Sequence, residues 1–121
     1  MPPFLAAVWI DHEHAKIFHV DEHRFDESLI HAPNKHVRRD PADAEHFFHQ
    51  VAAALASAGE ILVIGPGSAK LQLINHVHRH DHGLVDKIVG VETVDHPTDK
   101  QLVGYIRKYF HDEDRMRGLV P

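Results

Sequence analysis

The hydrophobic residues of the chain form segments that predict five strands. Residues 4–10 and 60–64 are continuous apolar runs, which are typical of strands buried on both faces of a sheet. Residues 15–20 follow the first run after a short polar turn, and they predict the return strand of a hairpin. Residues 24–31 predict a third strand, polar enough to lie at a sheet edge, and residues 87–94 predict the last strand.

Other apolar positions recur at helical spacing and predict three helices. The first helix should begin with Asp40 as its cap and Pro41 in its first turn, because the missing N–H of proline costs nothing there. Gly59 is the expected C-terminal stop of this helix. Its predicted apolar face consists of Ala44, Phe47, Phe48, Val51, Leu55 and Ala58.

A second helix should follow the tight turn at residues 65–68, with Ser68 as its cap and Gly83 at its end. We expect the side chains of His76 and His80 to face outward. The expected inward positions are Leu71, Ile74 and either Val77 or His78.

The third helix should begin at Thr98 and Gln101, which have the spacing of a capping box. From Asp112 onward the chain is charged, and we expect it to fray. The predicted apolar face of this helix is formed by Leu102, Val103, Ile106, Tyr109 and Phe110.

The order of these elements is three strands, helix, strand, helix, strand, helix, which predicts an α/β fold with a five-stranded mixed sheet and three helices. Parallel units in such a sheet should have right-handed crossovers. With 121 residues the chain is expected to form one domain, which we assign to residues 1–115, with a C-terminal tail at 116–121.

The composition is that of an ordinary globular domain, with 43% hydrophobic and 26% charged residues. No apolar run approaches the ~20 residues that a membrane-spanning helix needs, and the start of the chain does not resemble a secretory signal. Cysteine is absent, which excludes disulfides and thiolate metal sites. We therefore expect a cytoplasmic protein without a membrane partner.

Histidine is unusually abundant, with 14 residues spread along the chain. The formal net charge is −5 with neutral histidines, and protonating all 14 would raise it to +9. Histidine titrates near pH ~6.5 in the absence of perturbation. The strongly basic surface of many nucleic-acid-binding proteins is therefore missing at neutral pH, and any RNA affinity should rise in acid.

Three segments together carry a family resemblance: the strand and turn from Ile61 to Lys70, the hairpin from Val8 to Phe18, and the stretch from His46 to Val51. With the order of elements, they resemble the middle domain of the class-1 release factor of eukaryotes and archaea, of Pelota, and of bacterial stand-alone relatives. The resemblance covers nearly the whole chain. It implies a ribonuclease-H-like fold with strand order 3-2-1-4-5.

The chain departs from this family at the residues that promote peptide release. Release factors carry a Gly-Gly-Gln tripeptide between the third strand and the first helix. Here the corresponding residues 33–40 contain neither glycine nor glutamine. We therefore expect no peptide release and no enzymatic activity, and the resemblance implies a non-catalytic module that associates with the ribosome or with structured RNA.

Two groups of residues are candidates for phosphate binding. Lys35, His36, Arg38 and Arg39 form a dense basic cluster that could contact an RNA backbone, or else a solvated loop that offsets the acidic surface. Gly67, Ser68 and Lys70 form a turn at a helix start, where free N–H groups favour an anion. The simpler interpretation of this turn is a strand-to-helix connection that needs the backbone freedom of glycine.

Metal binding is a further hypothesis. His76 and His80 are four residues apart and can chelate zinc, nickel or copper on one helical face, or they are solvated histidines with only weak affinity. We expect no tightly bound cofactor. Asp11 ends the first strand and suggests a metal-dependent nuclease or hydrolase that uses Asp11 and the histidines. Such an enzyme would need further carboxylates, for which the candidates are Glu45, Asp86 and Asp95. The simpler interpretation of Asp11 is a hairpin-turn residue, because Asp is common in turns.

A third possibility is a protein-interaction or stress-response module in which the third strand, residues 24–31, pairs with its copy in a homodimer. An exposed strand edge offers unpaired backbone groups to such a partner.

Overall fold

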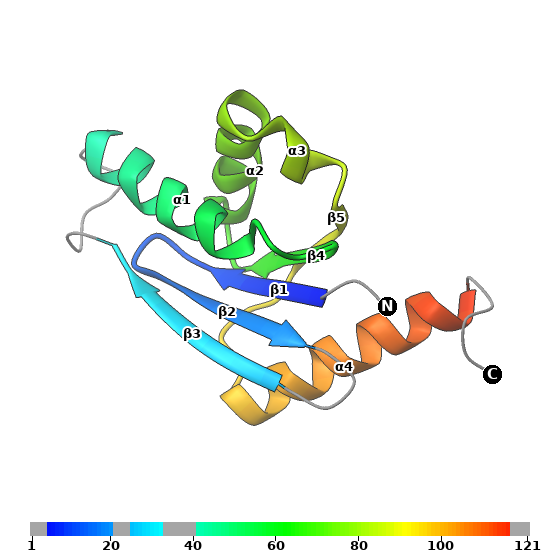
Figure 1. The fold of residues 1–121 in the computed structure, drawn as a ribbon. Coiled ribbons are helices and arrows are strands. Elements are labelled where there is room, and N and C mark those ends of the chain that lie inside the picture. The colour runs from blue at the N-terminus through cyan, green and yellow to red at the C-terminus, as the bar shows by residue number, and fades with distance from the viewer. Residues whose placement is uncertain (1–4, 21–24, 33–40, 117–121) are drawn as a thin grey trace.

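The computed structural model describes residues 5–20, 25–32 and 41–116. They form five strands in one sheet, with three helices on one face and a fourth helix on the other (Figure 1). The strands are β1 (Leu5–Ile10), β2 (His14–Val20), β3 (Phe25–His31), β4 (Glu60–Gly65) and β5 (Ile88–Thr93). The helices are α1 (Pro41–Leu55), α2 (Ala69–His80), α3 (His82–Val85) and α4 (Asp99–Met116).

The strand order is β3-β2-β1-β4-β5, which confirms the predicted order and the predicted mixed sheet. β1 pairs antiparallel with β2, and β2 pairs antiparallel with β3, so the first half of the chain forms two hairpins. β1 and β4 pair in parallel, as do β4 and β5. β3 lies at the edge of the sheet, as its polar sequence predicted.

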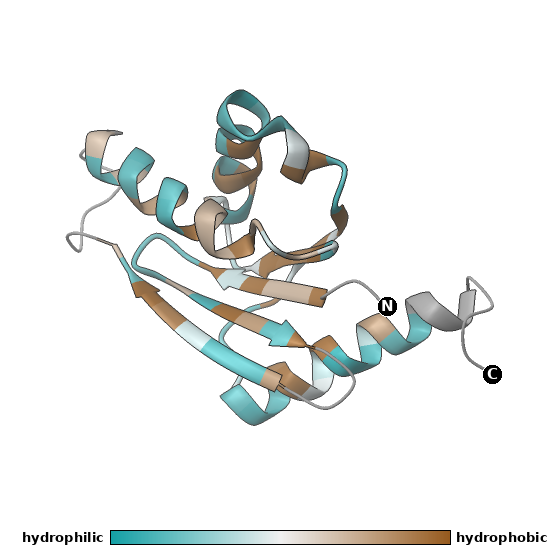
Figure 2. Ribbon diagram, viewed as in Figure 1, coloured by the Kyte–Doolittle hydropathy of each residue, from teal (hydrophilic) through white to brown (hydrophobic). Residues whose placement is uncertain are grey.

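The two central strands are buried on both faces because helices cover both sides of the sheet. Successive strand residues point to opposite faces. In β1, Val8 and Ile10 pack with α1 and α2, whereas Ala7 and Trp9 pack with α4. Figure 2 shows the hydrophobic residues concentrated in the strands and on the helix sides that face them. Continuous apolar runs in the sequence thus correspond to strands between two cores.

The helix ends differ from the predictions. α1 ends at Leu55, four residues before Gly59, and the chain reaches β4 through a turn with a hydrogen bond from Ala58 N to Leu55 O. Gly59 is not among the described glycines with a positive φ and lies beyond the end of α1, so the prediction that Gly59 stops this helix was wrong. α2 ends at His80, and Gly83 lies inside the one-turn helix α3 rather than closing α2. The described residues therefore contain four helices instead of three.

The buried face of α2 is rotated from the predicted one. Leu71 was expected to face inward but is 53% exposed, whereas His76 was expected to face outward and is only 2% exposed. The buried stripe passes through Leu73 and Val77, and the sheet and α1 determine where it lies. Because one residue turns a helix by about 100°, choosing the wrong leucine as the inward anchor changes which histidine is buried.

The start of α4 confirms the predicted capping box. The backbone N–H of Gln101 donates to Thr98 Oγ1 at 3.2 Å, and the backbone N–H of Thr98 donates to Gln101 Oε1 at 3.0 Å. The helix continues to Met116, past the predicted start of fraying at Asp112. None of the helices in the described part of the chain is both long and apolar enough to cross a bilayer.

Candidate functional site

The glycine-rich turn connects β4 to α2. Gly65 has φ +151° and Gly67 has φ +60°, and a Cβ atom at Gly65 would overlap the carbonyl oxygen of Ile10. The turn therefore needs glycine because the ends of β1 and β4 approach closely and the backbone is left-handed.

Of the polar side chains of this turn, that of Lys70 bonds back to the turn itself. Lys70 is 6% exposed, and its Nζ donates a hydrogen bond of 2.5 Å to the carbonyl oxygen of Gly67. Ser68 occupies the N-cap position of α2 without a side-chain hydrogen bond. Gly67, Ser68 and Lys70 do lie together, as the sequence implied, and a phosphate-binding role for them stays a prediction. The basic cluster of Lys35, His36, Arg38 and Arg39 lies outside the described residues.

Asp11 stabilises the turn between β1 and β2. Its Oδ1 accepts hydrogen bonds from the backbone N–H groups of Glu13 at 2.8 Å and His14 at 2.9 Å. Asp95 lies nearby, because His96 contacts the carboxylates of both residues, at 3.9 Å from Asp11 and 2.9 Å from Asp95. These hydrogen bonds fit the interpretation of Asp11 as a turn residue.

The other predicted carboxylates do not join Asp11. Glu45 is on α1, where its Oε1 lies 3.4 Å from Nε2 of His80, and Asp86 caps the C-terminal end of α3. Among the described residues, Asp11 belongs to no group of three metal-binding side chains. The geometry therefore does not favour the two-metal nuclease hypothesis.

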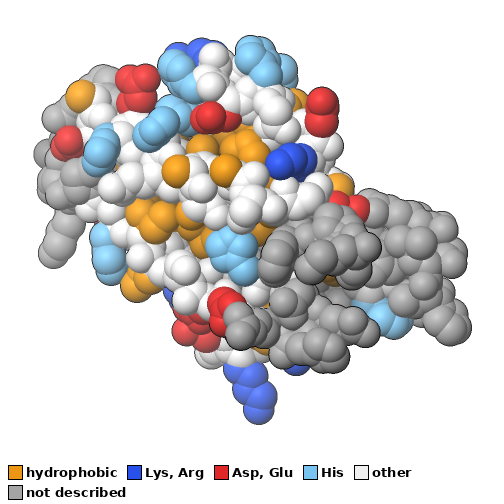
Figure 3. Space-filling model, viewed as in Figure 1, with side chains coloured by type: hydrophobic (Ala, Val, Ile, Leu, Met, Phe, Trp, Pro, Cys, Tyr) orange, Lys and Arg blue, Asp and Glu red, His pale blue; other side chains and the backbone are white. Residues whose placement is uncertain are grey.

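Histidines gather between α1 and α2. An open hollow of about 520 Å³ lies there, and pale-blue histidine side chains are visible over these helices in Figure 3. The lining contains one carboxylate and no Lys or Arg among the described residues, so its charge favours a cation. The lining residues are Ala42, Glu45, His46, His49, His76 and His80.

His76 is the buried member of this group. Its ring packs 6.0 Å from that of Phe48 and 4.7 Å from that of His80, measured between ring centroids. The Nε2 atom is buried without a hydrogen-bond partner. Burial, followed by the nearby His80, lowers the pKa of His76 below its usual 6.5, so the imidazole is neutral at neutral pH. His76 and His80 are thus neighbours, but they do not form the exposed pair that the sequence predicted.

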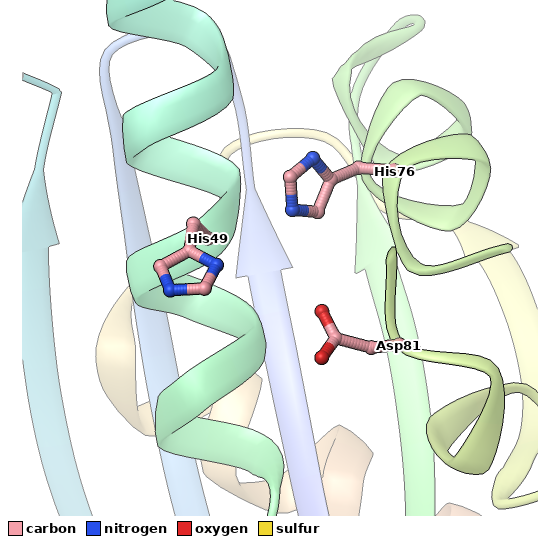
Figure 4. A group of neighbouring side chains, drawn as sticks. All are labelled: His49, His76 and Asp81. Carbon is pink, nitrogen blue, oxygen red and sulfur yellow. The ribbon is translucent and has the colours of Figure 1, made fainter. Parts of the chain in front are cut away.

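Two further residues, His49 and Asp81, complete the group. One ligand atom from each of His49, His76 and Asp81 lies within 4.8 Å of the others (Figure 4). His49 comes from α1, and Asp81 directly follows α2. Neither residue is among the metal ligands predicted from the sequence. The three-residue spacing of His46 and His49 on α1 was an available signal, but only the packing of α1 against α2 brings His49 to His76.

Comparisons with known proteins bear on the fold. No protein-family model matches the sequence, and no curated protein matches it. Among solved structures, Pelota of Archaeoglobus fulgidus superimposes with a TM-score of 0.70 at 18% identity, over 98% of this chain and 36% of Pelota. Dom34 of S. cerevisiae superimposes with a TM-score of 0.61 at 13% identity, over 83% of this chain and 31% of Dom34.

The archaeal translation termination factor aRF1 gives a TM-score of 0.58 at 14% identity, over 79% of this chain and 31% of the factor. The chain thus spans about a third of the length of each of these structures. They confirm the resemblance that the sequence motifs suggested. This protein has the fold of a domain shared by Pelota and translation termination factors.

Proposed function

We propose that this protein is a non-catalytic module of the translation machinery that binds the ribosome or structured RNA in the cytoplasm. The observation that carries the proposal is the superposition of nearly the whole chain on Pelota, at 98% coverage. Dom34, which has the same fold, is described as a translation termination-like factor involved in RNA quality control pathways and interacting with Hbs1.

The binding surface in this proposal is the segment at residues 33–40. It stands where release factors carry their Gly-Gly-Gln tripeptide, and here it has Lys35, Arg38 and Arg39 instead. These cations would bind phosphate groups, and the absence of glycine and glutamine argues against peptide release. The chain is acidic overall, with a formal charge of −5, so a local basic segment is needed to bring RNA to it.

The test is co-sedimentation with ribosomes of the organism that encodes the protein, over a range of salt concentrations. Arg38→Ala/Arg39→Ala should weaken binding and reduce the slope of log affinity against log salt by about 1.4, the value for two lost phosphate contacts on a single strand. Lys100→Ala/Lys108→Ala is the matched control, because it removes two exposed cations from α4. Equal losses in both variants, or no salt-dependent binding by the wild type, would overturn the proposal.

One observation supports the homodimer hypothesis. β3 is an edge strand, and Leu29 on it is 51% exposed. Pairing of β3 with its copy stays a prediction. Sedimentation equilibrium at high protein concentration tests it, and a monomer there would contradict it.

A further inference from the structure

Two buried polar atoms near the hollow have no partner. They are Nε2 of His76 and Oδ2 of Asp81. Buried polar groups in folded proteins are nearly always hydrogen-bonded, and each exception asks for an explanation such as a missing ion. The two side chains belong to the same small group, so one explanation should serve both.

The pair has the chemistry of a metal site. A neutral imidazole offers one lone pair beside its N–H group, and a carboxylate oxygen brings negative charge, yet the two unpaired atoms are not hydrogen-bonded to each other. A cation between them satisfies both atoms at once. His49 supplies a second imidazole from α1, which gives two nitrogen ligands and one oxygen ligand within 4.8 Å of one another (Figure 4).

The distances require only a small adjustment on binding. Tetrahedral zinc with bonds of about 2.0–2.2 Å separates its ligand atoms by about 3.4 Å. His49 is exposed, so its ring can rotate inward, while the buried His76 provides the fixed ligand. His80 lies beside His76, and its Nε2 is 3.4 Å from Oε1 of Glu45.

We infer that this protein binds one divalent transition-metal ion, with zinc as the fitting metal, through His49, His76 and Asp81. Two imidazoles and a carboxylate suit zinc among the common divalent ions. The ion links α1 to the end of α2, two segments that otherwise meet through apolar packing and the contact between Glu45 and His80. Three protein ligands leave a fourth position open toward the hollow for water or another small ligand.

The test is a zinc titration of untagged, chelator-treated protein in competition with a chromogenic chelator. The wild type should bind one tight zinc ion per chain. His49→Ala and Asp81→Asn should each weaken that site more than about 100-fold, because loss of an outer-shell partner alone costs about 10–100-fold. Asp81→Asn retains the backbone bonds of this residue, and His49 is exposed, so both variants should fold.

His78→Ala/His82→Ala is the matched control. These two exposed histidines lie 6.3 Å apart between ring centroids and come from the same part of the chain. The control should retain the wild-type affinity. If it loses as much affinity as the ligand variants, or if His49→Ala binds zinc like the wild type, the metal is held adventitiously by scattered histidines and the inference is wrong. Cobalt(II) gives a second readout, since a four-coordinate site should produce intense visible absorption in the wild type and lose it in Asp81→Asn.

Discussion

Replacing His76 with leucine should stabilise the metal-free protein. The histidine is 2% exposed and its Nε2 has no partner, and a buried unpaired polar group costs about 1–3 kcal/mol. Leucine has a similar volume, packs against the neighbouring Phe48, and is a better helix former than histidine. We therefore expect the free energy of unfolding to rise by about 1–3 kcal/mol. In a chain of this size, each kcal/mol should raise the Tm by about 3–6 °C.

The assay is thermal and urea unfolding at pH 7.5 with a chelator present. Trp9 is the single tryptophan of the chain and is 2% exposed, so its fluorescence reports loss of the core. His78→Leu on the same helix is the control, because an exposed substitution should change stability by no more than about 0.5 kcal/mol.

Zinc should reverse the order of stability. At a free zinc concentration about 1,000 times Kd, binding stabilises the wild type by about 4.1 kcal/mol, which exceeds the gain from leucine, whereas the leucine variant lacks the central ligand and gains little. A variant less stable than the wild type in chelator would refute the reasoning, because it would mean that His76 is satisfied in the metal-free protein. This result would be independent of whether the protein binds ribosomes.

Three other predictions concern the fold. Gly65→Ala should cost at least about 2 kcal/mol in urea unfolding, because it adds backbone strain and an overlap with β1; a change below about 0.5 kcal/mol would contradict the close approach. Thr98→Ala should cost about 0.5–2 kcal/mol through loss of the cap of α4, whereas Thr98→Ser should keep most of it, and equal losses would argue against capping. Burial and a hydrogen bond to Glu92 raise the pKa of Tyr105 to about 12 from 10.0, so its contribution to stability is complete below pH 10 and is lost between pH 10 and about 12. Tyr105→Phe should remove this loss from the pH profile of unfolding, and an unchanged profile would show that the phenol titrates normally.

The sequence was sufficient for the elements whose signals are local. The run from Ile61 to Ile64 is apolar throughout because both faces of its strand are covered, and it makes up most of β4. The polar third strand has to be at an edge, and the capping box at Thr98 involves residues three positions apart. Such features can be read from neighbouring residues, since the interactions that form them are short-range.

The candidate metal site required the tertiary structure. His49 and His76 are 27 positions apart on two helices, and no pattern within either helix says which faces meet. Counting Leu71 among the inward positions of α2 turned the predicted buried face away from His76. Packing against α1 and the sheet decides the rotation of α2, because it buries the largest apolar area, and only that rotation brings His76 to His49 and Asp81. The sequence by itself thus predicted the five strands and three of the four described helices, and the family resemblance supplied the order of the sheet, whereas the long-range packing of the helices decided where the histidines converge.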